Sequence, residues 1–215
     1  MDARVLIAVI PLFLLTSPSH AQPEKYDAGG RPEVCSNEEL RKAIRLIRAA
    51  CNNFNCDLEK LDKIDSTVDK ATLLFSLRSP QLLPVHIFFP VGKTDLVDAF
   101  DWPTIKREQL ASIRFLDNPG NSLIFVLGRA STIGDYDKNV LLSQKRASNV
   151  MSYIRDTLKV NCKSFHSAWL GETIFQWEIS DASFMNIPNR DYRSSRLVLN
   201  QSVHVFIFPC ADLIR

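Results

Sequence analysis

The residues best placed for chemistry lie in one stretch of the chain, from Ile124 to Val150. Gly128 ends a predicted strand, and Asn139 and Arg146 follow on a predicted helix. A glycine at such a point allows positive φ or the close approach of a ligand, and an arginine can hold a carboxylate through two parallel hydrogen bonds. A loop at this point could therefore hold a carboxylate. On the residues alone, the favoured interpretation is that Arg146 is a surface arginine paired with a nearby acid.

Two regular elements would position this loop. Apolar residues predict a strand over Ser122–Leu127, and helical spacing predicts a helix over Asn139–Leu158, with Asn139 as its cap. Ser143 and Ala147 lie on the same helical face as Val150 and Ile154. These small side chains would let the helix sit close to the sheet.

The same stretch resembles the OmpA-like peptidoglycan-binding domain, whose signature is Gly-x-Thr-Asp-x-x-Gly followed by Asn-x-x-Leu-Ser-x-x-Arg-Ala-x-x-Val. Eight positions match it in register: Gly128, Gly134, Asn139, Leu142, Ser143, Arg146, Ala147 and Val150. The resemblance covers about residues 84–209. It implies non-covalent binding of the peptidoglycan stem peptide through its diaminopimelate, and a structural role in the cell envelope.

The resemblance also implies roles for individual residues. Arg146 would bind the terminal carboxylate of diaminopimelate, and Asn139 would order the binding loop. Gly128, Ala130, Ser131 and Leu142 complete the predicted site.

This chain departs from the signature at the Thr-Asp pair, which is replaced by Ala130-Ser131. A hydrogen bond to a charged group contributes about 1.5–3 kcal/mol against about 1 kcal/mol for a neutral one. The missing aspartate is therefore expected to weaken binding about tenfold or more. Asp135 or Asp137 could replace part of the charge.

A second departure lies in the last strand, where the family has Asn-Arg-Arg-Val-Glu-Ile. This chain has Asn200-Gln201-Ser202-Val203-His204-Val205, without either arginine. Arg190, Arg193 and Arg196, just upstream, form either a basic rim or a solvated face, and the longer Trp177–Asn189 stretch is a candidate lid or partner loop. The departures keep open an alternative function, a periplasmic protein–protein interaction module that has the OmpA-like fold but has lost peptidoglycan binding.

The order of the predicted elements indicates the fold class. Strands at 85–89, 122–127, 165–170 and 203–208, with helices near 104–116 and 139–158, give the order β-α-β-α-β-β. This order predicts an α/β (α+β) sandwich with a mixed sheet and helices on one face. The OmpA-like family has the same architecture.

The N-terminal part of the chain predicts export. Residues 1–21 read as a signal peptide, with Arg4 before a short apolar run and a small-x-small cleavage site at Ser19–Ala21. Residues 22–34 would be a linker, 35–79 a helical hairpin and 80–215 the OmpA-like domain. The predicted location is the periplasm, associated with the cell envelope or outer membrane, and no transmembrane segment is expected in the mature chain.

The predicted hairpin has three possible uses. It could dock an envelope protein partner, its second helix (from Leu58 to Phe75) could seed a short coiled coil, or it could pack on the following domain. We favour packing, because Asp65 and Thr72 interrupt a strict heptad.

The chain has five cysteines, which suits an oxidising compartment. Cys51 and Cys56 flank a short polar turn and could form a disulfide, and Cys162 and Cys210 are provisionally paired. Cys35 is left over. A zinc site is the less favoured alternative, because paired C-x-x-C spacing is missing.

Other function classes find little support in the sequence. The net charge of +2 gives no indication of nucleic-acid binding. Hydrolase and zinc-protease motifs are missing, so neither catalytic residues nor a cofactor is predicted. Three predicted strands carry His86, His166 and His204. They could converge on a metal, but packed or rim imidazoles are the favoured interpretation, so the sequence predicts no metal site.

Overall fold

The computed structural model describes residues 38–52, 55–56, 84–111, 113, 122–160, 162, 164–172, 176–177 and 195–208. The predicted signal peptide and linker lie outside the described residues, as do Cys35, Arg190 and Arg193. Within the described part of the chain, none of the helices is long and apolar enough to cross a membrane.

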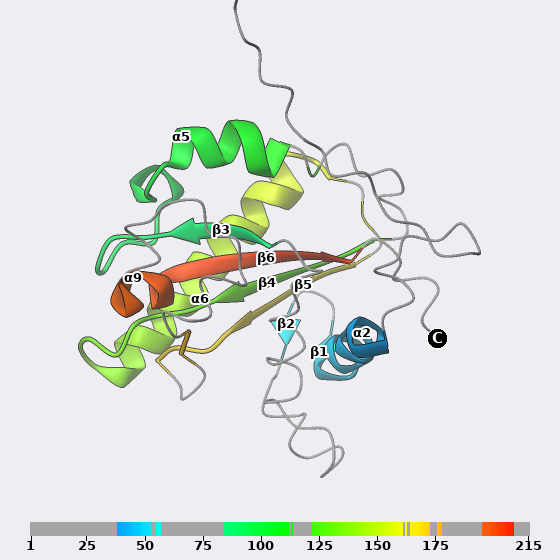
Figure 1. Ribbon diagram of the computed structural model, residues 1–215, viewed down its shortest axis with the longest axis horizontal. Helices are drawn as coiled ribbons and strands as arrows, with labels where there is room; N and C mark the ends of the chain where they lie inside the picture. Colours follow the sequence, from blue (N-terminus) through cyan, green and yellow to red (C-terminus); the bar gives the residue numbers. More distant parts are fainter. Residues whose placement is uncertain are drawn as a thin grey trace, which may run out of the picture.

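A mixed sheet forms the centre of the molecule (Figure 1). Its strand order is β1 (Cys51–Asn52), β2 (Asn55–Cys56), β5 (Ser164–Trp169), β4 (Leu123–Gly128), β6 (Ser202–Phe208) and β3 (Val85–Phe88). β4 runs parallel to β5, whereas β6 is antiparallel to both β4 and β3. The four predicted strands are all present, which confirms the predicted fold class.

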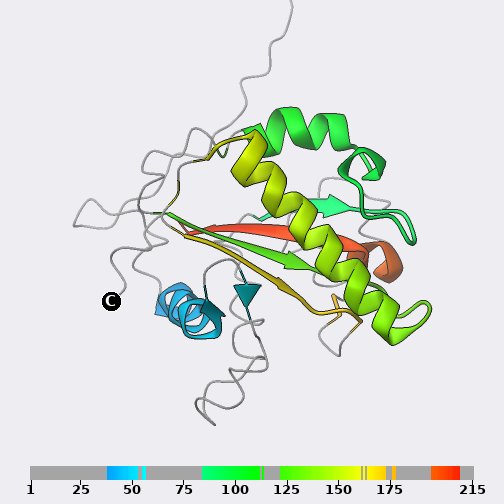
Figure 2. The same ribbon diagram turned by 180° about the vertical axis from the view of Figure 1, so that it is seen from behind.

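Helices cover one face of this sheet. α6 (Tyr136–Ser152) crosses the strands diagonally, with α5 (Trp102–Thr104) and its continuation η3 (Ile105–Leu110) beside it (Figure 2). η6 (Tyr153–Thr157) extends α6. Alternate strand residues, among them Val126 and Val205, pack there against Ala147, Val150 and Ile154 of the helix. The face predicted from the spacing of small and apolar residues in the helix is therefore the buried one.

The start of α6 differs from the prediction. The helix begins three residues before Asn139, and its cap is Asp135, whose carboxylate accepts a hydrogen bond from the Lys138 amide at 3.1 Å. The prediction that Asn139 caps the helix was wrong, because an aspartate satisfies the orphan amides equally well and comes first in the chain.

The predicted helical hairpin is described only in part. Its first helix is α2 (Glu38–Ala50), with buried Ala43, Ile44 and Ile47. The chain then forms β1 and β2, which pair antiparallel, and Asn55 of β2 is the register partner of Ser167 in β5. The predicted second helix lies outside the described residues. This N-terminal segment therefore adds strands to the edge of the sheet.

Both predicted disulfides stay predictions. Cys51 and Cys56 are direct register partners in β1 and β2, a placement that suits a disulfide, and their bond stays a prediction. Cys162 is half-buried just before β5, and its predicted bond with Cys210 also stays a prediction. Cys210 itself lies outside the described residues.

A short helix, α9 (Arg196–Asn200), precedes β6 and was not predicted. Ser195 caps it by accepting a hydrogen bond from the Val198 amide at 3.3 Å. Figure 1 shows α9 at the end of the sheet where β4 leaves for the predicted binding loop. The helix therefore brings Asn200 and Gln201 beside that loop.

Candidate binding site at the carboxyl ends of β4 and β5

The predicted binding loop joins β4 to α6 and lies beside the turn that follows β5. The amide of Ala130 donates to the carbonyl of Gly171 at 2.9 Å, and the amide of Gly171 donates to the hydroxyl of Ser143 at 2.9 Å. Because β4 and β5 are parallel, their carboxyl ends meet at one edge of the sheet. The structure thus gathers the motif-matching residues around one loop.

Gly128 has a packing function in this arrangement. A Cβ atom built on it would lie 2.1 Å from the backbone oxygen of Ser143 and 3.0 Å from the Cβ of Ala147. Only a glycine allows α6 to lie this close to the end of β4. The close approach expected at Gly128 is therefore made by the helix of the same chain.

Arg146 is enclosed in the protein and is only 1% exposed. Its guanidinium donates to three backbone carbonyls: Nε to Lys93 at 2.8 Å, Nη1 to Arg129 at 3.1 Å and Nη2 to Pro90 at 3.2 Å. The guanidinium carbon also lies 5.2 Å from the centroid of the Phe89 ring. Arg146 thus ties the loop after β3 to the end of β4.

The interpretation of Arg146 as a surface arginine paired with an acid was wrong. Burial lowers its pKa to about 10, so the side chain stays charged at neutral pH. Its hydrogen bonds go to neutral carbonyls. Periodicity could not show this, because the carbonyl partners on Lys93 and Pro90 lie 53 and 56 residues away in the chain.

The two departures from the family signature meet in space. Gln201 Nε2 donates to Ser131 Oγ at 3.1 Å, and both side chains are buried. Next to them, Ala130 is 1% exposed and its carbonyl accepts a hydrogen bond from Gln176 at 3.2 Å. A neutral hydrogen-bonded pair therefore occupies the position where the resemblance implies a ligand-binding charge.

Asn139 does order the loop, as predicted, although from within the helix. Its amide donates to the carbonyl of Ile133 at 3.1 Å and to the carboxylate of Glu172. Leu142 is half-buried on α6. Glu172 and Gln201 were not among the predicted site residues. Their signals in the sequence were the Gly171-Glu172 pair directly after the third predicted strand and the glutamine at position 201, where the family has an arginine.

The strand histidines do not gather into one site. His86 and His204 are register partners with an Nδ1–Nδ1 distance of 2.8 Å, whereas His166 lies on β5 opposite Phe125. In the described ranges, no group of three or more His, Cys, Asp or Glu side chains is placed to hold a metal.

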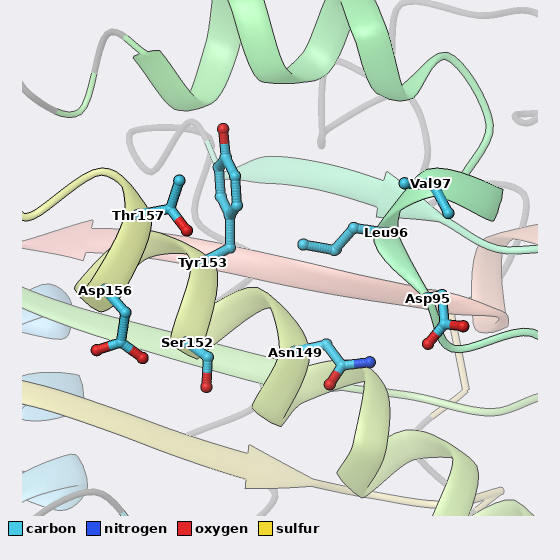
Figure 3. A pocket seen from close by; sticks show the side chains of 8 residues that line it. All are labelled: Asp95, Leu96, Val97, Asn149, Ser152, Tyr153, Asp156 and Thr157. Carbon is cyan, nitrogen blue, oxygen red and sulfur yellow. The ribbon is translucent and has the colours of Figure 1, made fainter.

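A separate open hollow of about 540 Å³ lies at the other end of α6. Figure 3 shows Asp95 and Asp156 on its two sides, with Leu96 directed toward Tyr153. Asp156 is already engaged by Arg155, whose Nε lies 2.7 Å from its carboxylate. This hollow is distinct from the predicted binding loop.

Comparisons with known proteins leave the family of this chain open. No family model matches the sequence. A curated biotin synthase from Chlorobium phaeovibrioides is 27% identical over 123 residues, which cover 56% of this chain and 36% of that protein. The chain thus spans about a third of the length of this curated relative.

Three solved structures are similar in shape at low identity. The peptidoglycan-associated lipoprotein from Burkholderia pseudomallei has a TM-score of 0.41 and 16% identity, covering 57% of this chain and 89% of that one. Two structures of the periplasmic domain of Helicobacter pylori MotB have TM-scores of 0.37, with 18% and 19% identity. They cover 56% and 59% of this chain and 69% and 70% of their own. Scores and identities at this level do not establish a shared function.

Proposed function

We propose that this chain is an exported, non-catalytic protein of the periplasmic cell envelope. Its OmpA-like arrangement would serve as a protein–protein interaction module that no longer grips the peptidoglycan stem peptide. The observation that carries this proposal is the state of Arg146, which is 1% exposed and donates to three backbone carbonyls. A ligand carboxylate would have to displace these bonds to reach the guanidinium.

The bond between Gln201 and Ser131 supports the same proposal. Paired charges that grip a ligand must be exposed or freed on binding, whereas here a buried neutral pair satisfies itself at 3.1 Å. The family signature has an aspartate at position 131 and an arginine at position 201, and this chain has neither. Because both charged residues are replaced, neither position places an unpaired charge in the interior, where it would be costly.

Peptidoglycan binding through diaminopimelate is the second candidate function. It is favoured by the way in which Gly128, Asn139 and Arg146 surround one loop at the carboxyl ends of two parallel strands. In this case the loop would open to expose Arg146, and Asp135 or Asp137, both exposed, would supply the missing negative charge.

Co-sedimentation with purified sacculi separates the two candidates. We expect the parent protein to remain in the supernatant. A double variant, Ser131→Asp with Gln201→Arg, places opposite charges at the same position but leaves the three Arg146 bonds in place, so we expect it to remain in the supernatant as well. The single Ser131→Asp change would bury a carboxylate opposite an amide, so it is expected to be less stable than the double variant.

Sedimentation of the parent protein would overturn the interaction proposal in favour of wall binding. In that case Arg146→Ala should abolish binding and Ser131→Asp should strengthen it. Arg155→Ala is the matched control, because Arg155 lies on the extension of the same helix, is exposed and pairs with the exposed Asp156. Melting curves of both arginine variants show whether lost binding reflects lost structure.

A further inference from the structure

A hydrogen-bonded network of three ring side chains, His86, His204 and Trp177, lies on the sheet face opposite α6. His86 of β3 and His204 of β6 are register partners, and their rings meet edge to face with centroids 4.9 Å apart. The indole nitrogen of Trp177 lies 3.0 Å from Nε2 of His204. His204 is 0% exposed and Trp177 2% exposed, so the network is shielded from solvent.

The donor and acceptor capacities of these side chains determine which ring nitrogen of His204 carries a proton. The indole N–H can only donate, so Nε2 of His204 must be the acceptor and carry no proton. In a neutral imidazole the proton then sits on Nδ1. The 2.8 Å contact between the two Nδ1 atoms is therefore a bond donated by His204 and accepted by His86.

Ser202 supplies a second partner for the same nitrogen. Its hydroxyl donates to the Leu199 carbonyl at 2.6 Å, and its Oγ lies 2.7 Å from Nε2 of His204. While Nε2 is unprotonated, the single hydroxyl proton can lie toward either the Leu199 carbonyl or Nε2. Once Nε2 carries a proton, the hydroxyl donates to Leu199 and its oxygen accepts the bond from Nε2.

The surroundings of His204 oppose protonation at neutral pH. Burial lowers its pKa well below the ordinary value, with smaller contributions from His86 and Arg129. Among the described residues these are the titratable or charged groups that act on it: His86 lies on β3, and Arg129 follows β4 with its guanidinium carbon 4.7 Å from the Trp177 ring centroid. The register partner of His204 on β4 is the apolar Leu127. Within β6, the His204 ring contacts the uncharged side chains of Ser202 and Phe206.

We propose that His204 is an acid-operated latch on Trp177. At neutral pH, Nε2 accepts the indole N–H and holds the side chain against the sheet. A proton taken up at Nε2 turns this nitrogen into a donor, so its hydrogen bond passes to Ser202 Oγ and the indole is released. Release would uncover Phe88 and Leu199, which form a small apolar cluster with Trp177.

The latch acts on the side chain, since the Trp177 backbone has its own attachment. Its amide donates to Asn200 Oδ1 at 2.7 Å, and its carbonyl accepts from Asn200 Nδ2 at 2.9 Å. Asn200 does not titrate, so these bonds persist on acidification. The device is also separate from the Arg146 contacts, and its test is independent of the proposed envelope function.

Tryptophan fluorescence of the full chain from pH 8 to pH 4 tests the latch, with far-UV circular dichroism recorded in parallel. Subtracting the signal of Trp177→Phe isolates Trp177 from Trp102 and Trp169. We expect a reversible change in the Trp177 signal before any loss of secondary structure. Ser202→Ala removes the acceptor for the protonated nitrogen, so the midpoint should fall by about one pH unit, the equivalent of one hydrogen bond.

His204→Gln should abolish the transition, because its amide oxygen can accept the indole bond but does not titrate. His166→Gln is the matched control. His166 lies on the same face of the sheet but does not belong to the network, so its replacement should leave the midpoint unchanged. A transition in His204→Gln equal to that of the parent, or no Trp177 change before global unfolding, would overturn the proposal.

Nitrogen-15 spectra of the histidine rings test the latch in the parent protein, so this measurement does not depend on any variant folding correctly. At pH 8 we expect His204 as the Nδ1–H tautomer, with its Nε2 resonance moving on acidification. An Nε2–H tautomer at pH 8 would contradict the latch directly.

Discussion

The two faces of the sheet use alternate residues of the same strands, yet they are held by different forces. Toward α6, side chains such as Ile87, Val126 and Val205 form one apolar core with the helix. On the opposite face, His86 and His204 form a buried polar chain with Trp177. Apolar packing depends on shape and is insensitive to pH, whereas the polar chain depends on each donor finding its acceptor. The difference predicts where the molecule is rigid and where solution conditions can change it.

The largest effect is expected where the helix-covered face is tightest. Gly128→Ala would place a Cβ 2.1 Å from the backbone of α6, so we expect it to lower the unfolding free energy by about 3 kcal/mol or more. Gly92→Ala is the control, because its φ of +71° adds backbone strain in open space and should cost only about 1 kcal/mol. Urea unfolding measures both. Equal costs would show that α6 does not pack as closely as described.

A second experiment probes the sheet edge to which the N-terminal segment is attached. Deleting residues 35–78 removes α2 together with β1 and β2, which pairs with β5 through Asn55 and Ser167. We expect the melting temperature to fall by several degrees, since 1 kcal/mol corresponds to about 2–4 °C in a domain of this size. An unchanged melting curve, with a lower mass by light scattering, would instead indicate an independent docking or dimerising arm.

The third prediction uses pH to separate the two faces. Burial lowers the pKa of both His204 and His166, with a further contribution from Arg48 at His166, so the unfolded chain binds protons that the folded chain does not. Stability should be fully retained above about pH 6.5 and should fall by up to about 1.4 kcal/mol per pH unit per histidine below it.

Urea unfolding at pH 7.5 and pH 5.5 checks this prediction. His166→Gln should reduce the difference between the two values, because it removes one of the two histidines. A tryptophan signal from Trp102, which contacts Tyr153 on the helix-covered face, should not change before unfolding. A stability that rises toward pH 5.5 would contradict the assignment of neutral buried histidines.

The smallest effect is expected at the start of α6. Asp135→Ala removes the cap and should lower the unfolding free energy by about 1 kcal/mol. Asp137→Ala changes an exposed acid in the same turn without removing a cap, so its effect should be smaller. Thermal melting of the two variants side by side tests the comparison. A larger loss for Asp137→Ala would show that Asp135 is not the functional cap.

The sequence predicted the elements well but placed their ends less well. Apolar residues located β3, β4, β5 and β6, because a strand buried on one face carries them at alternate positions and a strand buried on both faces can carry them in a run. The start of α6 was missed by three residues, since aspartate and asparagine are equally good caps. α9 was missed because five residues are too few for a helical period to show.

The candidate site was located by sequence, but its state was not. Motif spacing brought attention to Gly128, Asn139 and Arg146, and these residues do surround one loop. Whether Arg146 faced solvent or the interior depended on carbonyls from another part of the chain. Ser131 and Gln201 are 70 positions apart in the sequence. Neither residue by itself therefore indicated that a neutral hydrogen bond stands where the family has charged side chains.

The sequence by itself determined the periods of the strands and helices and the apolar face of α6. Tertiary structure decided the partners: His86 lies beside His204, 118 residues later in the chain, and Ser131 lies beside Gln201, 70 residues later. The physical reason is that burial follows from the local alternation of apolar residues. A hydrogen bond or a disulfide instead requires two groups within a few ångströms, and only strand order and register set that distance.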